Sequence, residues 1–146
     1  RGEEGARTGD ILVGYLDTIA RLTEAAEKSA ASQPAAIRDK LIARISGLVD
    51  GDVVIEPERL AQEAALLAVK ADVAEELDRL AGHVEGARNL LKEGGPVGRR
   101  MDFLSQEFSR EANTLCAKSA DAELTRLGLE LKAVIDRLRE QVQNLE

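Results

Sequence analysis

Cysteine, proline and aromatic residues are all scarce in this sequence of 146 residues. Its one cysteine, Cys116, has no intrachain partner, so the chain contains neither a disulfide framework nor a cysteine-rich zinc site. A reducing, cytoplasmic setting is the simplest expectation for such a chain. No uninterrupted apolar run approaches the roughly 20 residues that a membrane span requires, and the first residues do not form a signal peptide. The sequence therefore predicts no membrane partner.

Positive charge is in the minority. The chain has 20 Lys and Arg residues against 27 Asp and Glu residues, which gives a formal net charge of −7. This balance does not favour general attraction to nucleic acid or to an anionic membrane. When the chain is divided after residues 55, 96 and 118, only 97–118 is positive, with four basic and three acidic residues. An anionic ligand is therefore expected on the basic residues of this segment, which are Arg99, Arg100, Arg110 and Lys118.

Helical periodicity dominates the sequence, while alternating β-branched runs are nearly absent. Helices are expected over residues 8–31, 34–46, 57–71, 73–93 and 97–118, and through the last segment to the C-terminus. The apolar stripe of the first helix is predicted to consist of Ile11, Tyr15, Ile19, Leu22 and Ala26. The last helix repeats apolar residues at the spacing of coiled coils, on Leu124, Leu127, Leu131, Val134, Leu138, Val142 and Leu145.

We therefore predict an all-α fold of long antiparallel helices, in hairpins that pack as a coiled-coil-like bundle. The Gly-Gly-Pro sequence at residues 94–96 is expected to join two of these helices as one hairpin. Asp72 followed by Glu75 is a capping-box pattern, which predicts a helix start or a kink. Residues 1–55 are predicted to be a helical linker or the first helices after a preceding domain, and residues 56–146 a C-terminal helical domain.

Two polar stripes carry the residues that are suited to chemistry. The first, on the helix after Asp72, lines up Asp72, Glu76, Arg79 and His83 beside the apolar face. Imidazole exchanges protons near neutral pH, and guanidinium binds phosphate. The structural alternative is that Asp72 only caps the helix, that Glu76 and Arg79 form an ordinary i, i+3 ion pair, and that His83 is a packing residue.

The second stripe lies on the predicted helix over 97–118, opposite its apolar face. It consists of Arg99, Asp102, Gln106, Arg110 and Asn113, with Arg100, Glu107, Glu111 and Lys118 along one flank. Glu107 and Glu111 are one turn apart and repel each other unless a positive charge lies nearby. Either Arg100, Arg110 and Lys118 supply that charge as surface ion pairs, or a divalent metal or a phosphate site is present. Phe103 points away from the apolar face, so it packs on a neighbouring helix or subunit, or it stacks on a nucleobase.

These residues form a distinctive motif, Gly-Arg-x-x-Asp-Phe-Leu-x-Gln-Glu-x-x-Arg-Glu-Ala-Asn-Thr at 98–114. Together with segments 72–83 and 139–146, it resembles the C-terminal half of the YicC/YloC family of bacterial endoribonucleases. The resemblance implies that an N-terminal domain of mixed α/β character precedes Arg1, so that the chain is the C-terminal part of a larger α+β protein. It also implies metal-dependent, single-strand-selective RNA cleavage in bacterial RNA turnover, with Mn²⁺ favoured over Mg²⁺. Ring-shaped homo-oligomers, expected as hexamers, are typical of the family.

The two stripes and the resemblance together define the candidate site. The candidate catalytic residues are His83, Glu76, Asp102, Glu107 and Glu111. The candidate RNA-binding residues are Arg79, Arg99, Arg100, Gln106, Arg110, Asn113 and Lys118, and the candidate metal ligands are Glu107 and Glu111. The alternative function is a non-catalytic helical module that oligomerises or clamps RNA, with catalysis in the preceding N-terminal domain.

Overall fold

The computed structural model describes residues 2–48 and 55–145, and within these ranges the chain forms six α-helices and no strand. The helices are α1 (Gly2–Ala31), α2 (Gln33–Leu48), α3 (Pro57–Lys70), α4 (Ala74–Glu93), α5 (Gly98–Lys118) and α6 (Ala122–Val142). The predicted all-α fold is confirmed, and Pro57 begins α3 as expected, because proline suits the first turn of a helix. None of the helices in the described part is long and apolar enough to cross a membrane.

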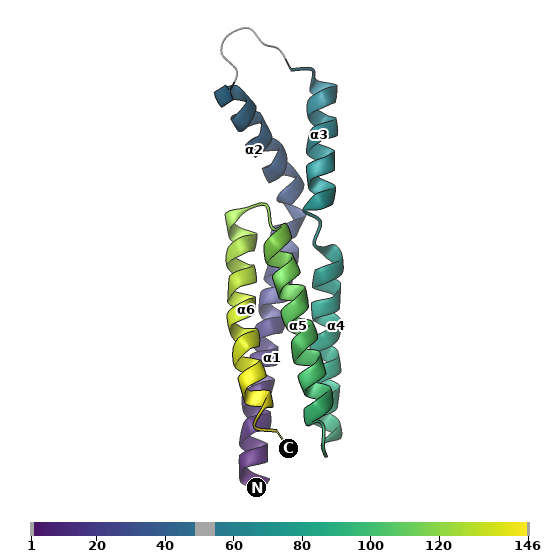
Figure 1. The fold of residues 1–146 in the computed structure, drawn as a ribbon, viewed down its shortest axis with the longest axis vertical. Helices are drawn as coiled ribbons and strands as arrows, with labels where there is room; N and C mark the ends of the chain where they lie inside the picture. Colours follow the sequence, from purple (N-terminus) through teal and green to yellow (C-terminus); the bar gives the residue numbers. More distant parts are fainter. Residues whose placement is uncertain (1, 49–54, 146) are drawn as a thin grey trace.

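Four of the helices form an antiparallel bundle (Figure 1). Helices α1 and α5 run in one direction and α4 and α6 in the other, and each of the first two packs against both of the others. Helices α2 and α3 form a second hairpin that extends from one end of the bundle. The prediction of long antiparallel helices is therefore confirmed, with α1 as one wall of the bundle.

The interior of the bundle is made of aliphatic side chains around one aromatic ring, that of Phe108, which is fully buried. Helix α1 contributes Ile19, Leu22 and Ala26, as its periodicity predicts. The predicted stripe is wrong at Ile11 and only partly right at Tyr15, which packs against the edge of the core. Ile11 is 38% exposed and Tyr15 only partly buried, whereas Leu12 and Leu16 point into the core. The buried face of α1 is rotated by one residue there because it fits between α4 and α6, and adjacent apolar residues made either register possible.

The core also bears on the predicted division of the chain. Side chains of α1 and of α4–α6 belong to one hydrophobic cluster, so residues on both sides of position 55 contribute to it. A boundary between domains at residues 55 and 56 stays a prediction.

The hairpin of α4 and α5 is confirmed, and its turn depends on two glycines. Gly94 and Gly95 both have φ of 70°, a region that side chains with a Cβ rarely adopt. At the start of α4 the expected capping box forms only in part. The Asp72 carboxylate accepts a hydrogen bond from the Ala74 backbone N–H at 3.0 Å, but the Glu75 carboxylate faces Arg79 at 3.6 Å. The N-cap residue is therefore Val73, and Asp72 before it accepts one hydrogen bond from the first residue of the helix.

Helix α6 is buried along the predicted stripe, from Leu124 to Val142, with Leu145 partly buried beyond it. The Asp121 carboxylate caps the helix by accepting a hydrogen bond from the Leu124 N–H at 2.8 Å. Gly128 lies in the middle of the same face. It lets α6 approach α5 so closely that a Cβ at this position would lie 2.7 Å from Cys116 Sγ and 2.8 Å from Leu115 Cδ2.

Replacing Gly128 with Ala should therefore destabilise the protein, although alanine is the better helix former. The gain in helix propensity is about 1 kcal/mol, and overpacking a tight helix contact costs about 1–3 kcal/mol. Gly14 on α1 is the matched control, since a Cβ there meets no atom within 4 Å. Gly14→Ala should stabilise by about 0.5–1 kcal/mol in urea unfolding. Equal stabilisation by both substitutions would contradict the close approach of α5 and α6.

Helix α3 differs from the bundle helices because none of its residues is buried. Its apolar residues at helical spacing, Leu60, Ala64, Leu67 and Ala71, predict one buried face, but only Ala71, which follows the helix, is buried. Leu67 is 40% exposed. The reason is that α3 packs mainly against α2, so two helices alone must cover each other's apolar faces.

Candidate active site

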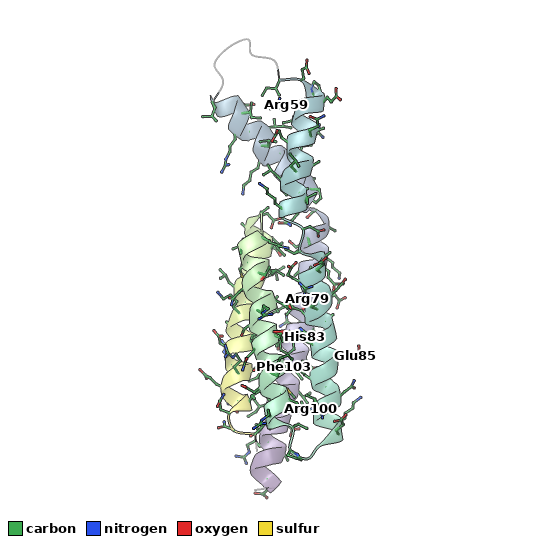
Figure 2. The ribbon with its side chains drawn as sticks, turned by 45° about the vertical axis from the view of Figure 1, so that its right-hand side comes forward. Arg59, Arg79, His83, Glu85, Arg100 and Phe103 are labelled. Atoms are coloured by element: carbon green, nitrogen blue, oxygen red, sulfur yellow. The ribbon has the colours of Figure 1, made fainter. Side chains whose placement is uncertain are left out.

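The polar residues of α4 and α5 meet along the surface of their hairpin. Figure 2 shows Arg79, His83, Phe103 and Arg100 following one another along this face of the bundle. The antiparallel packing of the two helices brings the stripe of α4 beside residues near the C-terminal end of α5. Five side chains gather there, Glu76, Arg79 and His83 from α4 and Glu111 and Lys118 from α5. We refer to these five residues as the polar cluster.

Glu111 is the central carboxylate of the polar cluster. It is only 4% exposed, and its two oxygens face different partners on α4. Oε1 lies 3.0 Å from Arg79 Nε, and Oε2 lies 3.8 Å from His83 Nε2. A buried carboxylate is costly unless a positive charge lies beside it, and Arg79 supplies that charge. The hydrogen bond to Glu111 is also the main cause of the raised pKa of the Arg79 guanidinium.

Glu76 is a second buried carboxylate on the other side of Arg79. Its Oε2 lies 3.0 Å from Lys118 Nζ and 3.5 Å from Arg79 Nη2. Its Oε1 is buried and has no hydrogen-bond partner among the described residues. Arg79 thus lies between two buried carboxylates, while its own side chain remains 46% exposed. Such an arrangement fixes the guanidinium in place and leaves part of it open to a ligand.

His83 is held at the edge of the core. Its ring packs edge-on against the Phe108 ring, with centroids 5.8 Å apart and an interplanar angle of 84°. Its Nε2 atom is buried without a hydrogen-bond partner in the described part of the chain, since 3.8 Å to Glu111 is too long for a hydrogen bond. The imidazole is therefore oriented by packing and lies close to a carboxylate.

The polar stripe of α5 lies largely outside this cluster. Arg99, Gln106, Arg110 and Asn113 are exposed, and Asp102 is half-buried. The Asp102 carboxylate accepts a hydrogen bond from the Gln106 amide at 2.9 Å. The structure thus brings Glu111 and Lys118 to the stripe of α4 and leaves these five residues along the outer side of α5.

The predicted compensation of Glu107 and Glu111 by surface cations holds only in part. Arg110 faces Glu107 at 3.7 Å, as expected. Arg100 instead faces Glu93 at 3.3 Å, and Lys118 faces Glu76. The partner of Glu111 is Arg79 across the helix interface, which spacing along one helix cannot indicate.

The donors at Glu107 and Glu111 do not fit a divalent ion held by this chain alone. Residues 2–48 and 55–145 contain no group of three or more His, Cys, Asp or Glu side chains that could hold a metal ion. Both oxygens of Glu111 already face Arg79 and His83, and Glu107 faces Arg110. A manganese or magnesium ion at this site therefore stays a prediction.

Phe103 is 62% exposed, so the described residues leave most of its side chain uncovered. It borders a groove of about 550 Å³ at the turn end of the α4–α5 hairpin, together with Asn89, Arg99 and Arg100. Glu93 also lines the groove and faces Arg100, so Arg99 is the arginine there without that acidic partner. An exposed aromatic ring beside arginine suits a nucleotide whose base stacks on the ring and whose phosphate contacts a guanidinium group. Contact with a second subunit is the other prediction that this exposure leaves open.

Cys116 lies under α6 on the opposite side of α5 from this site. Burial is the main cause of the raised pKa of its thiol, which the positive charge of Lys132 only partly offsets. A thiol with a raised pKa is mostly protonated at neutral pH and is a poor nucleophile. Cys116 is therefore a packing residue beside Gly128.

Comparison with known proteins gives one consistent family. Residues 26–146 match the family described as "Endoribonuclease YicC-like, C-terminal". The chain is 46% identical over 149 residues to a protein of Haemophilus influenzae named "Probable endoribonuclease YicC", with 100% of this chain and 50% of the relative covered. A protein of Clostridioides difficile with the same name is 38% identical over 146 residues, again covering 100% of this chain and 50% of the relative. The chain thus spans about half the length of the curated relatives it matches.

Proposed function

The chain belongs to the YicC-like endoribonuclease family, and from this we propose that it is the helical half of an enzyme that cleaves single-stranded RNA in bacterial RNA turnover. The observation that supports a catalytic role most strongly is the imidazole of His83 beside the buried carboxylate of Glu111. Arg79 lies next to this pair, Lys118 is joined to Arg79 through Glu76, and the side chains of Arg79 and Lys118 are partly exposed.

RNA cleavage requires three things of the protein. A proton must leave the attacking oxygen, negative charge on the phosphate must be stabilised, and a proton must reach the leaving oxygen. Imidazole is the side-chain group most often used for proton transfer in enzymes, and that of His83 lies beside the Glu111 carboxylate. Arg79 and Lys118 can bind the phosphate oxygens as charged donors. The polar cluster thus contains one group for proton transfer and two for charge stabilisation.

We assign the surrounding residues to substrate binding. The exposed polar row of α5 consists of Arg99, Gln106, Arg110 and Asn113, and it offers donors to an RNA backbone. Phe103 and Arg100 offer stacking and charge farther along the same hairpin. No step is assigned to a metal ion, because Glu76, Glu107 and Glu111 already face arginine, lysine or histidine.

A non-catalytic module that oligomerises or clamps RNA is the second candidate. Exposed apolar side chains near the C-terminal end of α3 favour it, since Leu66 is 60%, Leu67 40% and Val69 74% exposed. Such side chains mark interaction surfaces when they gather on one element. For both candidate functions we propose that the protein is a homo-oligomer, expected as a hexameric ring, and that it is located in the cytoplasm.

Replacing His83 with Gln in the full-length protein tests the catalytic proposal. Loss of a group that transfers protons should lower the rate of single-stranded RNA cleavage by about 10²–10⁴-fold, with little change in RNA affinity. Glu85→Gln is the control, because Glu85 is exposed on the same helix and points away from the α5 side in Figure 2. Normal cleavage by the His83 variant would place catalysis elsewhere and favour the clamping module.

A further inference from the structure

A second positively charged site lies where the α2–α3 hairpin joins the bundle. A groove of about 390 Å³ is bounded by α2, by the C-terminal end of α3 and by the C-terminal end of α5. Its cationic residues are Lys40 and Arg44 from α2, Lys70 from α3 and Lys118 from α5. No acidic residue is among the described residues that line it. Four cations without an acid are unexpected in a chain whose net charge is −7.

The floor of the same groove is apolar. Ile37 and Leu41 from α2 and Leu67 and Ala71 from the α3 side form it. Leu67 keeps 40% of its surface exposed there, although it is a large aliphatic residue. An apolar floor with a cationic rim suits a ligand that combines a flat apolar body with phosphate groups. A nucleotide of a single-stranded nucleic acid has this chemistry, since its base stacks on apolar surface and its phosphate binds cations.

One buried glutamine holds the walls of the groove together. The Gln33 side-chain amide donates a hydrogen bond to the Ala71 carbonyl at 2.9 Å, and its oxygen accepts one from the Ala120 N–H at 2.7 Å. Lys40 Nζ also donates to the Ala120 carbonyl at 3.2 Å. Three segments that are far apart in the sequence are thereby fixed to one another. A groove that is already formed loses less entropy when a ligand binds.

The groove is continuous with the polar cluster through Lys118. Lys118 Nζ donates to Glu76 at 3.0 Å, and Glu76 in turn faces Arg79 at 3.5 Å. Arg79 is the partner of Glu111, which lies beside His83. Lys118 therefore belongs both to the polar cluster, where Glu76 lies between it and Arg79, and to the lining of the groove with Lys40, Arg44 and Lys70. A phosphodiester chain bound at His83 would reach the groove by passing Lys118.

We infer that this groove binds the RNA strand on the Lys118 side of the bond that is cleaved, with a base over Leu41 and Leu67 and phosphates on Arg44 and Lys70. This inference rests on the proposed function for the identity of the ligand as RNA. The groove accounts for how an acidic protein holds an anionic substrate, because a local group of cations attracts phosphate despite the net charge. The alternative occupant of the groove is a second copy of the chain, and the test below distinguishes it from RNA.

The test uses full-length protein carrying His83→Gln, so that RNA stays intact during binding. Arg44→Gln and Lys70→Gln are added together, and affinity for a labelled single-stranded RNA is measured by fluorescence anisotropy over a range of salt. Each lost phosphate contact should reduce the slope of log affinity against log salt by about 0.7, and the pair should lower affinity at physiological salt by about tenfold. Lys28→Gln with Arg59→Gln is the control, since it removes two exposed cations outside the groove.

The results separate the inference from the proposed function. A reduced slope and affinity in the groove variant, with both restored by Arg44→Lys and Lys70→Arg, would support the groove. A groove variant that binds like the control would overturn it, as would a change of oligomeric state in light scattering with unchanged RNA binding. Cleavage by the protein with His83 intact is measured in parallel. Its absence would overturn the nuclease proposal without affecting the binding result.

Discussion

Replacing Glu111 with Gln in the full-length protein is expected to lower the turnover of single-stranded RNA by about 10²–10⁴-fold. Glutamine keeps the shape of the side chain and removes its negative charge. Glu111 faces both Arg79 at 3.0 Å and His83 at 3.8 Å, so the substitution removes the negative charge beside the imidazole and the main anionic partner of the guanidinium. Because Glu111 acts through these two residues, we expect kcat to fall while RNA affinity changes little.

Glu107 provides the matched comparison one helical turn away. Its partner is the exposed Arg110, and it does not contact the polar cluster. Glu107→Gln is therefore expected to keep turnover within about threefold of the unmodified enzyme, since an ion pair with an arginine as exposed as Arg110 is worth only about 0–1 kcal/mol. A large loss that added manganese reverses would instead identify Glu107 as a metal ligand. Equal turnover by the Glu111 variant and the unmodified enzyme would contradict the role given to the polar cluster.

Replacing Leu138 with Ala should cause the largest loss of stability. Leu138 is fully buried on α6 within the bundle core. Truncating a buried leucine costs about 2–5 kcal/mol, because the lost contacts leave a cavity that neighbouring side chains fill only in part. In the full-length protein, we expect the unfolding transition of the helical half to move to a clearly lower melting temperature and a lower urea midpoint.

Leu129→Ala is the control for this substitution on the same helix. Leu129 is 55% exposed, so its truncation should change the free energy of unfolding by no more than about 0.5 kcal/mol. Oligomer size is measured alongside, since an exposed leucine can also contact another subunit. Unfolding curves that do not differ between the two variants would show that α6 is not packed as the structure has it.

The sequence by itself determined the helices and the hairpin between α4 and α5. Apolar residues at three- and four-residue spacing specify a helix with one buried face, and the stripe of α6 is buried as that spacing predicts. Gly94 and Gly95 end α4 because both adopt a positive φ that other residues avoid. The motif at 98–114 also identified the family, since such a combination of residues rarely recurs by chance. All of these features are local in the chain.

Only the tertiary structure decided which polar residues meet. Spacing along a helix placed Glu111 beside Glu107, but its partners Arg79 and His83 belong to α4 and reach it through helix packing. Arg100 pairs with Glu93 and Lys118 with Glu76, whereas the spacing predicted Glu107 and Glu111 as partners. Long side chains can reach carboxylates on several neighbouring turns and helices, so spacing along one helix does not determine the pair.

The sequence likewise did not predict the groove or which residues of α1 are buried. Gln33 gives no signal in the sequence, yet its two hydrogen bonds join the ends of three helices that are distant along the chain. In α1, adjacent apolar residues allow two registers, and the fit between α4 and α6 selects Leu12 and Leu16 over Ile11. Periodicity fixes a face within one helix, whereas the rotation of that helix and its neighbours follow from the packing of all four together.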